Sequence, residues 1–527
     1  MTNEQYDILI EIWECWFGSF RTPYDNPIRI KDCERFSYAP QSYGYVFFNG
    51  THCDDFQLTP AGEQLLSAKR KDEVFLRQML KFQLPSPFHK PTEKAASFCV
   101  KPYLEILRLI RTLGVLKFDE LQIFGMQLTD YHNFEKIVSK IKKFRVAKTE
   151  NKGSYRNFRT EYLHKELSSI YHERISKGET KTRESEDSSL KKFLDTQSSN
   201  MRDYADACFR YLRATGLVSV SHVGKSLSIV PERISDVDYI LKNVSRDPGS
   251  FSTEDEYIAY IGDCTTPILM TDNRPQLVKK IATEFPETKI PKKATILELK
   301  DLLADLLENR KNATLATQIA EIKDYRLYDD IQNTFLQILN NELYDNPLML
   351  EWNTWRAMTM LDGGRINANL HFDDFGKPLS TAAGNMADII CDYGDYFVCV
   401  EVTMATGQRQ YEMEGEPVTR HLGKLKKTTN KPCYCLFIAP SINDACISHF
   451  YTLHHLNLAM YGGKSTIIPL PLNVFQKMVE DSYKVHYSPN PDHVKNFFEC
   501  SNIIAKSAEN ESDWYEKIKD KALHWLD

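Results

Sequence analysis

A predicted β-strand, residues 396–403, carries one carboxylate within an apolar pattern and constrains the fold more than any other feature of the chain. Side chains alternate between the two faces of a strand, so Glu401 shares a face with Phe397 and Cys399. Burying a carboxylate without a partner is costly, so Glu401 requires a cation, hydrogen-bond donors or a raised pKa. Thr403 continues its face, and the opposite face holds Tyr396, Val398, Val400 and Val402.

Asp388 stands at the start of the preceding predicted strand, and Tyr393-Gly394-Asp395 supplies the turn that joins the two strands into a hairpin. A divalent ion shared by Asp388 and Glu401 across this hairpin would meet the need, because Mg²⁺ prefers carboxylate, water and phosphate oxygens as ligands. Such an ion polarises a phosphate and lowers the pKa of water. The hairpin therefore predicts a centre that hydrolyses phosphodiester bonds.

The next helix is expected to begin at Pro417, because proline is favoured in the first turn of a helix. Glu414 would then lie just before the helix, placed to orient a water molecule or to hold a second ion. His421 and Lys424 fall about one turn apart on one side of it, which suits proton transfer and phosphate contact respectively. The joint spacing on a strand, turn, strand and helix favours a nuclease centre.

Asn346-Pro347 opens an earlier predicted helix, on which Glu351, Trp352 and Trp355 fall close to one face. A carboxylate beside two tryptophans is a candidate third metal ligand. The alternative is that Glu351 points to water or pairs with Arg356.

The first 145 residues show a pattern of short strands and helices. A strand from Tyr43 to Phe48, an Asn49-Gly50 turn and a second strand ending near Leu58 predict a hairpin. Thr59-Pro60 caps a helix, and further helices are predicted from Pro102 to Leu113, over 118–124 and over 134–144. This is typical of a helix-turn-helix or winged-helix unit, although other small helical units share it.

A basic span from Lys136 to Arg159 lies at the end of this region, and Glu150 is the only acidic residue within it. Tyr155 and Phe158 are interleaved with the last bases, which suits phosphate contact beside sugar or base stacking. We therefore expect a DNA-binding face, with a solvated helix face and a flexible loop as the alternative. The candidate DNA-binding residues of the span are Lys142, Lys143, Arg145, Lys148, Lys152, Arg156 and Arg159, with Lys136 and Lys140 beside them.

A serine-rich link over 185–199 precedes a third amphipathic unit, the predicted helix 201–214. Strands at 217–220 and 227–230 follow and read as a wing. After residue 246 helices dominate, with a predicted buried stripe of Ile296, Leu299, Leu303 and Leu306. In helix 201–214 the residues expected inward are Tyr204, Cys208, Tyr211 and Leu212, and those expected on other faces are Arg202, Arg210 and Arg213, of which Arg210 and Arg213 are DNA-contact candidates.

Bulk properties fit a multidomain globular protein. The chain has 527 residues, more than one hydrophobic core supports, and its net charge of −6 can still conceal a basic face. The 12 cysteines include no Cys-x-x-Cys pair, so their spacing implies neither a zinc site nor a disulfide framework. An acidic N-terminus and the lack of a long apolar run predict a cytoplasmic protein without a membrane span.

Several motifs together resemble the AlwI-like type IIS restriction endonucleases, a family that also contains strand-specific nicking enzymes. They are Ala-Ala-Gly-Asn at 382–385, Glu-Val-Thr at 401–403, Glu-Pro-Val-Thr-Arg-His at 416–421, and Cys435-Leu-Phe-Ile-Ala-Pro440. Further similarity lies at Tyr-Gly-Tyr-Val-Phe (43–47), Leu-Thr-Pro-Ala-Gly (58–62) and Ala-Asp-Ala-Cys-Phe-Arg-Tyr-Leu-Arg-Ala-Thr-Gly-Leu (205–217), so the resemblance covers most of the chain.

The resemblance implies a multidomain α+β protein: a tandem winged-helix-like DNA-recognition region, a helical linker and a C-terminal α/β PD-(D/E)XK nuclease domain. We place recognition subdomains at 1–145 and 146–245, the linker at 246–325 and the nuclease domain at 326–527. Family members use Mg²⁺ to cut DNA a few base pairs to one side of a short asymmetric site. The matching active-site positions are Glu351, Asp388, Glu401, Glu414 and His421, with Asp388, Glu401 and Glu351 as metal ligands.

The chain departs from the general superfamily pattern at two positions. Thr403 stands where a lysine is usual, and Ala387 precedes Asp388 in place of proline. The resemblance suggests that His421 or a lysine of the following helix replaces the missing lysine.

The expected activity is site-specific cleavage of double-stranded DNA that leaves 5′-phosphate and 3′-hydroxyl ends. The expected partners are a transient second copy or a small second nuclease subunit for the other strand, and a methyltransferase that acts on the same site. One alternative is a nicking enzyme with the same chemistry. Another is a tandem winged-helix regulator that binds DNA without cutting it.

Overall fold

The computed structural model describes residues 5, 8, 12, 42–48, 56–88, 98–182, 185–361, 363–382, 386–485 and 491–526. The chain divides into two compact units, residues 1–307 and 308–527. This division falls inside the helix α14 (Ile296–Lys323), whereas the sequence placed the start of the nuclease domain at 326. Within the described ranges, no helix is both long and apolar enough to cross a bilayer.

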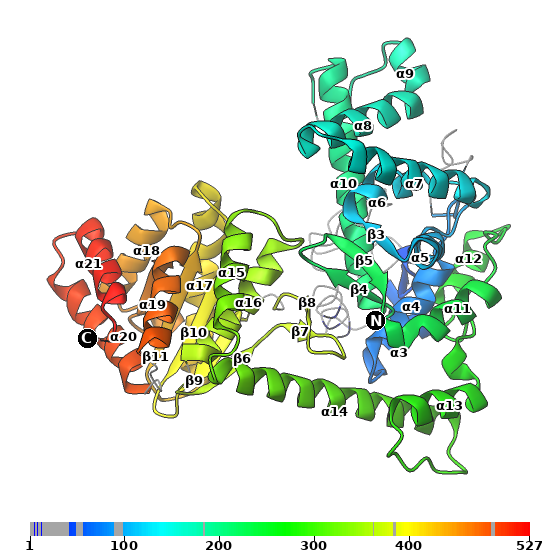
Figure 1. The fold of residues 1–527 in the computed structure, drawn as a ribbon. Coiled ribbons are helices and arrows are strands. Elements are labelled where there is room, and N and C mark those ends of the chain that lie inside the picture. Colours follow the sequence, from blue (N-terminus) through cyan, green and yellow to red (C-terminus); the bar gives the residue numbers. More distant parts are fainter. Residues whose placement is uncertain are drawn as a thin grey trace. The chain divides into compact units, whose positions relative to one another are not determined.

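In the first unit the predicted hairpin is present just before α3 (Pro60–Ser67), the earliest helix labelled in Figure 1. Strands β1 (Val46–Phe48) and β2 (Phe56–Leu58) pair antiparallel, and the proposed Asn49-Gly50 turn lies outside the described residues. The side chain of Thr59 accepts a hydrogen bond from Gly62 N and caps α3 (Pro60–Ser67), as predicted. Helix α4 (Lys71–Lys81) follows.

The helices predicted in the middle of this unit are confirmed. Helix α5 (Pro102–Leu113) ends at Gly114, whose φ of 76° a residue with a side chain rarely adopts. Strand β3 (Val115–Lys117), α6 (Phe118–Ile123) and α7 (Phe134–Glu150) follow. Helix α7 runs six residues past the predicted end at 144, so the proposed boundary at 145/146 lies within one continuous helix.

Residues 155–214 are far more helical than predicted. Helix α8 (Tyr155–Ile170) occupies the stretch for which a flexible loop was an alternative, and α9 (His172–Ser176) follows. The serine-rich link was wrong from residue 190 onward, because α10 (Leu190–Ala214) begins there, capped by the Ser189 side chain. Buried Phe193 and Leu194 hold this extra length of helix in place.

The faces of α10 match the prediction at Cys208, Tyr211 and Leu212, which are buried. Two predictions were wrong: Tyr204 is exposed, and Arg213, expected on an outer face, is 6% exposed. Strands β4 (Val218–Ser221) and β5 (Ser226–Ile229) form the predicted wing hairpin. Strand β3 joins them, giving the order β3-β5-β4, so strands from both proposed recognition subdomains share one sheet.

The remaining part of the first unit is helical, as expected. It contains α11 (Ile234–Asn243), α12 (Glu254–Gly262), α13 (Arg274–Glu284) and the first half of α14. Leu299 and Leu303 of the predicted stripe are buried and pack with Leu277 and Ile281 of α13. Leu306 is partly buried, but Ile296 is exposed, because Leu307 rather than Ile296 completes this cluster.

The second unit is built on a five-stranded mixed sheet in the order β12-β11-β10-β9-β6. Strands β10 (Phe397–Val402), β11 (Cys433–Ala439) and β12 (Ile467–Pro471) are parallel. Strands β9 (Ile389–Asp392) and β6 (Arg365–Ala368) continue the sheet antiparallel on the other side. A small hairpin of β7 (His371–Phe372) and β8 (Pro378–Ser380) stands apart.

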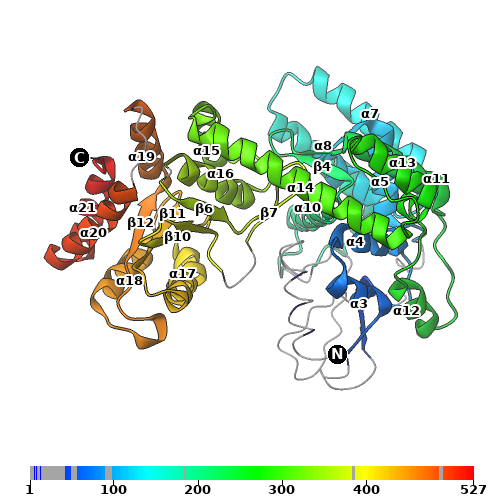
Figure 2. The same cartoon turned by 90° about the horizontal axis from the view of Figure 1, so that it is seen from below.

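Helices cover both faces of this sheet (Figure 2). Helices α16 (Asn346–Leu361) and α19 (Leu472–Lys484) lie on one face, with α15 (Tyr328–Leu339) against α16. Helices α17 (Gln408–Thr428) and α18 (Asp444–His455) lie on the other. Helix α21 (Glu511–Leu523) packs on β12 beside α20 (Pro491–Ser507). All seven residues of β11 are buried, which marks it as the centre of the core.

Candidate active site

The β9–β10 hairpin brings two carboxylates together, as predicted. Val400 pairs with Ile389, so Asp388 and Glu401 lie opposite each other one position further along the ladder. The backbone N–H of Val402 donates to Asp388 Oδ2 at 2.8 Å and fixes that carboxyl at the end of the strand. Glu401 is only 4% exposed. The predicted turn is present, with Gly394 at a φ of 86°.

Glu351 reaches the same place from α16. Its side chain is buried, and its Oε2 accepts a hydrogen bond from the backbone N–H of Ala382 at 3.1 Å. The alternative that Glu351 points to water or pairs with Arg356 is wrong. Arg356 instead lies 4.3 Å from the ring centre of Trp352 and forms an ion pair with Asp330.

Helix α17 supplies the fourth carboxylate, and its predicted start was wrong. The helix begins at Gln408, so Glu414 lies within it and Pro417 is inside the helix rather than at its first turn. The cause is the buried side chain of Gln410, which donates to Ala405 O and Ser441 O and accepts from Asn443 N. These hydrogen bonds stabilise the first turns of the helix. Their contribution exceeds the cost of the backbone hydrogen bond that Pro417 cannot donate.

All four carboxyl groups have raised pKa values. Burial is the largest cause for each, and the charge of a neighbouring carboxylate follows for three of them: Asp388 raises the pKa of Glu351, Glu401 that of Asp388, and Glu414 that of Glu401. Burial likewise raises the pKa of Glu414, opposed by a hydrogen bond with the Thr403 side chain. A set of acids that suppress one another's ionisation is chemically matched to a hard divalent cation.

His421 projects from α17 onto this cluster. Its Nδ1 lies 2.9 Å from Glu401 Oε1, and burial together with the charges of Arg420 and Lys424 lowers the pKa of His421 to about 4. The ring is therefore neutral at neutral pH, and we assign its proton to Nδ1, which faces Glu401 Oε1. Nε2 is buried and has no hydrogen-bond partner among the described residues. This nitrogen can accept a proton.

The predicted basic span is only partly available to a ligand. Lys142, Lys143, Lys152 and Arg156 are exposed, whereas Arg145 pairs with Glu120 at 2.7 Å. Glu150 is the only acid within the span, but α6 and α8 contribute further acids that pair with it. Lys148 pairs with Asp119, Lys140 pairs with Glu166, and Arg159 donates to Gln122.

The remaining candidates lie on two helices. Arg210 pairs with Asp206 on α10 at 3.0 Å, and Arg213 of that helix is buried. Lys424 is exposed on α17, on the side of His421 as predicted.

Three contributions to the site were missed from the sequence: the Ala382 N–H, the Thr403 hydroxyl and Asp345. Asp345 immediately precedes α16, and its charge helps to raise the pKa of Glu351. An acid before Asn-Pro resembles an ordinary helix start, so no sequence signal separates it. The role of Thr403 had one signal, its place two residues after Glu401 on the same strand face.

Two solved structures are similar to parts of this chain. The small subunit of the heterodimeric restriction endonuclease R.BspD6I is 24% identical, with a TM-score of 0.29, over 39% of this chain and 95% of that one. The BpuJ1 endonuclease binding domain, in complex with pyrene- and phenanthrene-modified DNA, is 12% identical, with a TM-score of 0.28, over 42% of this chain and 73% of that one. A search of curated proteins gave no match.

A model of the AlwI restriction endonuclease family matches residues 43–478, well over half of the chain. That family's members are DNA-cleaving restriction enzymes, which is the chemistry that the carboxylate cluster suits. This protein belongs to the AlwI restriction endonuclease family.

Proposed function

We propose that this protein is a type IIS restriction endonuclease that recognises a short asymmetric DNA site and hydrolyses phosphodiester bonds a few base pairs to one side with Mg²⁺. The observation that carries the proposal is the convergence of Glu351, Asp388, Glu401 and Glu414 beside a neutral histidine. A DNA-binding regulator has no use for four mutually repelling carboxyls in one place, because they destabilise the fold unless a cation offsets their charge.

Asp388, Glu401 and Glu351 are the residues assigned to hold Mg²⁺. When bound, the ion supplies charge stabilisation at the scissile phosphate and lowers the pKa of water. Glu401 is oriented for this role by His421 Nδ1, and Asp388 by the N–H of Val402. Glu414 stands on the neighbouring helix, where it can orient a water molecule.

Position 403 holds threonine where a lysine is usual, so we assign the roles of that lysine to two other residues. Thr403 cannot donate a positive charge, and its side chain is engaged with Glu414. We assign proton acceptance to His421 Nε2, because this nitrogen is buried and has no hydrogen-bond partner among the described residues. Lys424, one turn further along α17, is assigned to phosphate contact.

The two compact units support a division of labour. We propose that residues 1–245 form a tandem winged-helix-like recognition region whose two parts share the β3-β5-β4 sheet, that 246–325 links it to the rest, and that 326–527 is a PD-(D/E)XK nuclease domain. Exposed Lys142, Lys143, Lys152 and Arg156 provide the phosphate contacts. In the cell we expect a cytoplasmic enzyme whose recognition site is protected by a methyltransferase, with a second copy or a small second subunit cutting the other strand.

Cleavage of plasmid DNA followed by run-off sequencing of the products tests this proposal. We expect Mg²⁺-dependent cuts at a fixed distance to one side of one short sequence, with 5′-phosphate ends that a ligase can rejoin. Linear product indicates cutting of both strands, and open circles that persist at high protein concentration indicate a nicking enzyme. Specific binding without any cleavage at any Mg²⁺ concentration would contradict the proposal and favour the regulator.

A further inference from the structure

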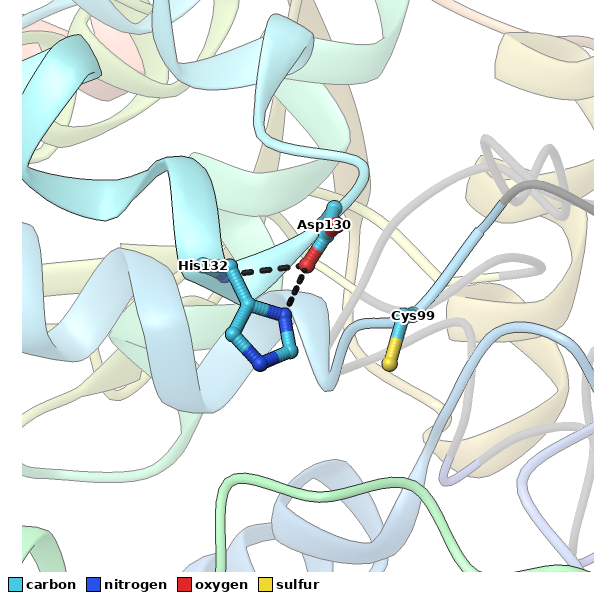
Figure 3. A group of neighbouring side chains, drawn as sticks. All are labelled: Cys99, Asp130 and His132. Atoms are coloured by element: carbon cyan, nitrogen blue, oxygen red, sulfur yellow. Dashed lines mark hydrogen bonds and ion pairs between the residues drawn. The ribbon is translucent and has the colours of Figure 1, made fainter.

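Three potential metal ligands gather in the first unit, apart in sequence from the carboxylate cluster. They are Cys99, Asp130 and His132, shown in Figure 3. Cys99 N donates to Thr129 O at 2.8 Å and Tyr131 N donates to Cys99 O at 3.0 Å, so the two segments are joined by a parallel bridge. Backbone hydrogen bonds therefore fix the distance between the thiol and the other two side chains.

The donor atoms are close enough to share one ion. One ligand atom of each residue lies within 4.8 Å of those of the other two. Asp130 Oδ1 accepts from the backbone N–H of His132 at 2.9 Å and lies 2.7 Å from His132 Nδ1. This contact holds the imidazole beside the carboxylate, and an ion bound between the two would take the place of the shared proton. Cys99 and Asp130 are half-buried and the side chain of His132 is 67% exposed, so an ion can reach the site.

A cysteine beside a histidine and an aspartate can also be a catalytic nucleophile, and the surroundings of Cys99 argue against that role. A nucleophilic thiol needs a lowered pKa. Burial raises the pKa of Cys99, and the charges of Asp130 and Asp247 raise it further. Two anions near a thiol suit a cation that would displace its proton.

We propose that Cys99, Asp130 and His132 bind a divalent transition-metal ion of the zinc class, with solvent completing the coordination. Sulfur, imidazole nitrogen and carboxylate oxygen are together typical ligands of Zn²⁺, whereas Mg²⁺ prefers oxygen alone. A site with a single cysteine leaves no Cys-x-x-Cys pattern, which is why the spacing of the 12 cysteines did not reveal it.

Neighbouring residues hold the histidine side of this site in place. The ring of Tyr131 stacks on His132 with centroids 4.1 Å apart, and its hydroxyl donates to Asp247. Arg246 donates to Tyr131 O at 3.1 Å and is itself paired with Glu105. Residues 131–133 lead directly into α7, the helix that carries exposed Lys142 and Lys143. A bound ion would therefore tie the start of α7 to the strand segment at Cys99.

Titration of the metal-stripped full-length protein with Co²⁺ tests the proposal, because a cobalt–thiolate bond gives a charge-transfer absorption that oxygen and nitrogen ligands do not. We expect this absorption in the wild type and its loss in Cys99→Ser. The matched control is Cys500→Ser, which changes another half-buried thiol and should keep the signal. Ions held by the carboxylate cluster do not depend on Cys99, so the two sites are distinguishable.

His132→Gln provides a second measurement in case Cys99→Ser folds poorly, because the His132 side chain is largely exposed. We expect its Co²⁺ and Zn²⁺ affinities to fall at least about tenfold. At the same concentration, Zn²⁺ should raise the unfolding midpoint of the wild type more than that of this variant. His172→Gln, at another exposed histidine, should behave as the wild type. Equal thiolate absorption in Cys99→Ser and wild type, its absence from the wild type, or unchanged affinity in His132→Gln would overturn the proposal.

Discussion

His421 Nδ1 lies 2.9 Å from Glu401 Oε1, while Nε2 of the same ring is buried without a hydrogen-bond partner among the described residues. One imidazole thus orients a carboxylate and offers a proton-accepting nitrogen to the same site. The two roles can be separated, because an asparagine side chain can replace the Nδ1 donor but has no counterpart of a basic Nε2.

His421→Asn should lower the single-turnover cleavage rate by about 10²- to 10⁴-fold, the usual contribution of a proton-transferring group. DNA affinity should stay within about twofold of the wild type, since binding does not use this nitrogen. The control is His455→Asn, at an exposed histidine of α18. Full activity in His421→Asn would reduce His421 to a positioning residue for Glu401.

The pH profile of the cleavage rate tests whether the His421 ring is neutral at the working pH. Burial lowers the pKa of His421 to about 4, so the ring is already neutral at mildly acidic pH. We therefore expect no step in the wild-type cleavage rate that depends on His421 between about pH 8 and 6, and a step in that range that disappears in His421→Asn would contradict the lowered pKa.

Asp388→Asn should stabilise the metal-free protein at neutral pH. The pKa of Asp388 is raised in the folded state, so the folded protein binds the proton more tightly than the unfolded chain. Stability from this group is greatest below the unfolded pKa and is lost as pH rises toward the raised folded value. Removing the charge should therefore raise the free energy of unfolding of the metal-free protein at neutral pH.

Denaturant unfolding in EDTA and in Mg²⁺ measures this effect. Mg²⁺ should stabilise the wild type and have much less effect on Asp388→Asn. The control Asp392→Asn changes the acid at the other end of β9, which has no place in the cluster. Destabilisation of metal-free Asp388→Asn at neutral pH would mean that repulsion within the cluster is not the dominant cost.

The hairpin and the first helix of the site were predictable because they depend on local rules. The period of a strand determined which face carries Glu401, and the Tyr393-Gly394-Asp395 turn determined that Asp388 would face it. Asn-Pro likewise identified the start of α16. These signals lie within a few residues of the structures they specify.

Tertiary contacts decided the elements that were mispredicted. The rule for proline at a helix start failed at Pro417, because the contacts of Gln410 with Ala405 and Ser441 hold an earlier start. The basic span was predicted to be largely unopposed because Glu120 is distant in sequence from its partner Arg145. Such pairs depend on how helices pack, which local sequence does not specify.

Gln410→Ala should destabilise the second unit by about 1 to 3 kcal/mol, because it leaves buried backbone groups unsatisfied. The start of α17 would loosen, and with it the placement of Glu414 and His421. Gln408→Ala, an exposed position two residues earlier, is the control. Unfolding midpoints and cleavage rates of both variants are the measurement. Equal stability of the two would show that another contact holds this helix start.

Replacing Lys142 and Lys143 together with glutamine should weaken DNA binding at all sequences alike and make it less dependent on salt. For each phosphate that the protein no longer neutralises, the log–log salt slope should become shallower by about 0.9. The control removes two exposed lysines of the second unit, Lys484 and Lys506. An unchanged slope in Lys142→Gln/Lys143→Gln would exclude this part of α7 from the DNA-binding surface.

The most direct test of the central claim is the cleavage rate of Glu401→Gln. It is measured when the protein is saturated with DNA and the bound fraction is known. Glutamine keeps the size of the side chain and can still accept from His421, but it removes the charge assigned to Mg²⁺. The account predicts specific DNA binding like that of the wild type and cleavage reduced by at least about 10³-fold. Glu412→Gln, an exposed acid on α17, should cleave normally. Wild-type cleavage by Glu401→Gln would contradict the assignment of the active site.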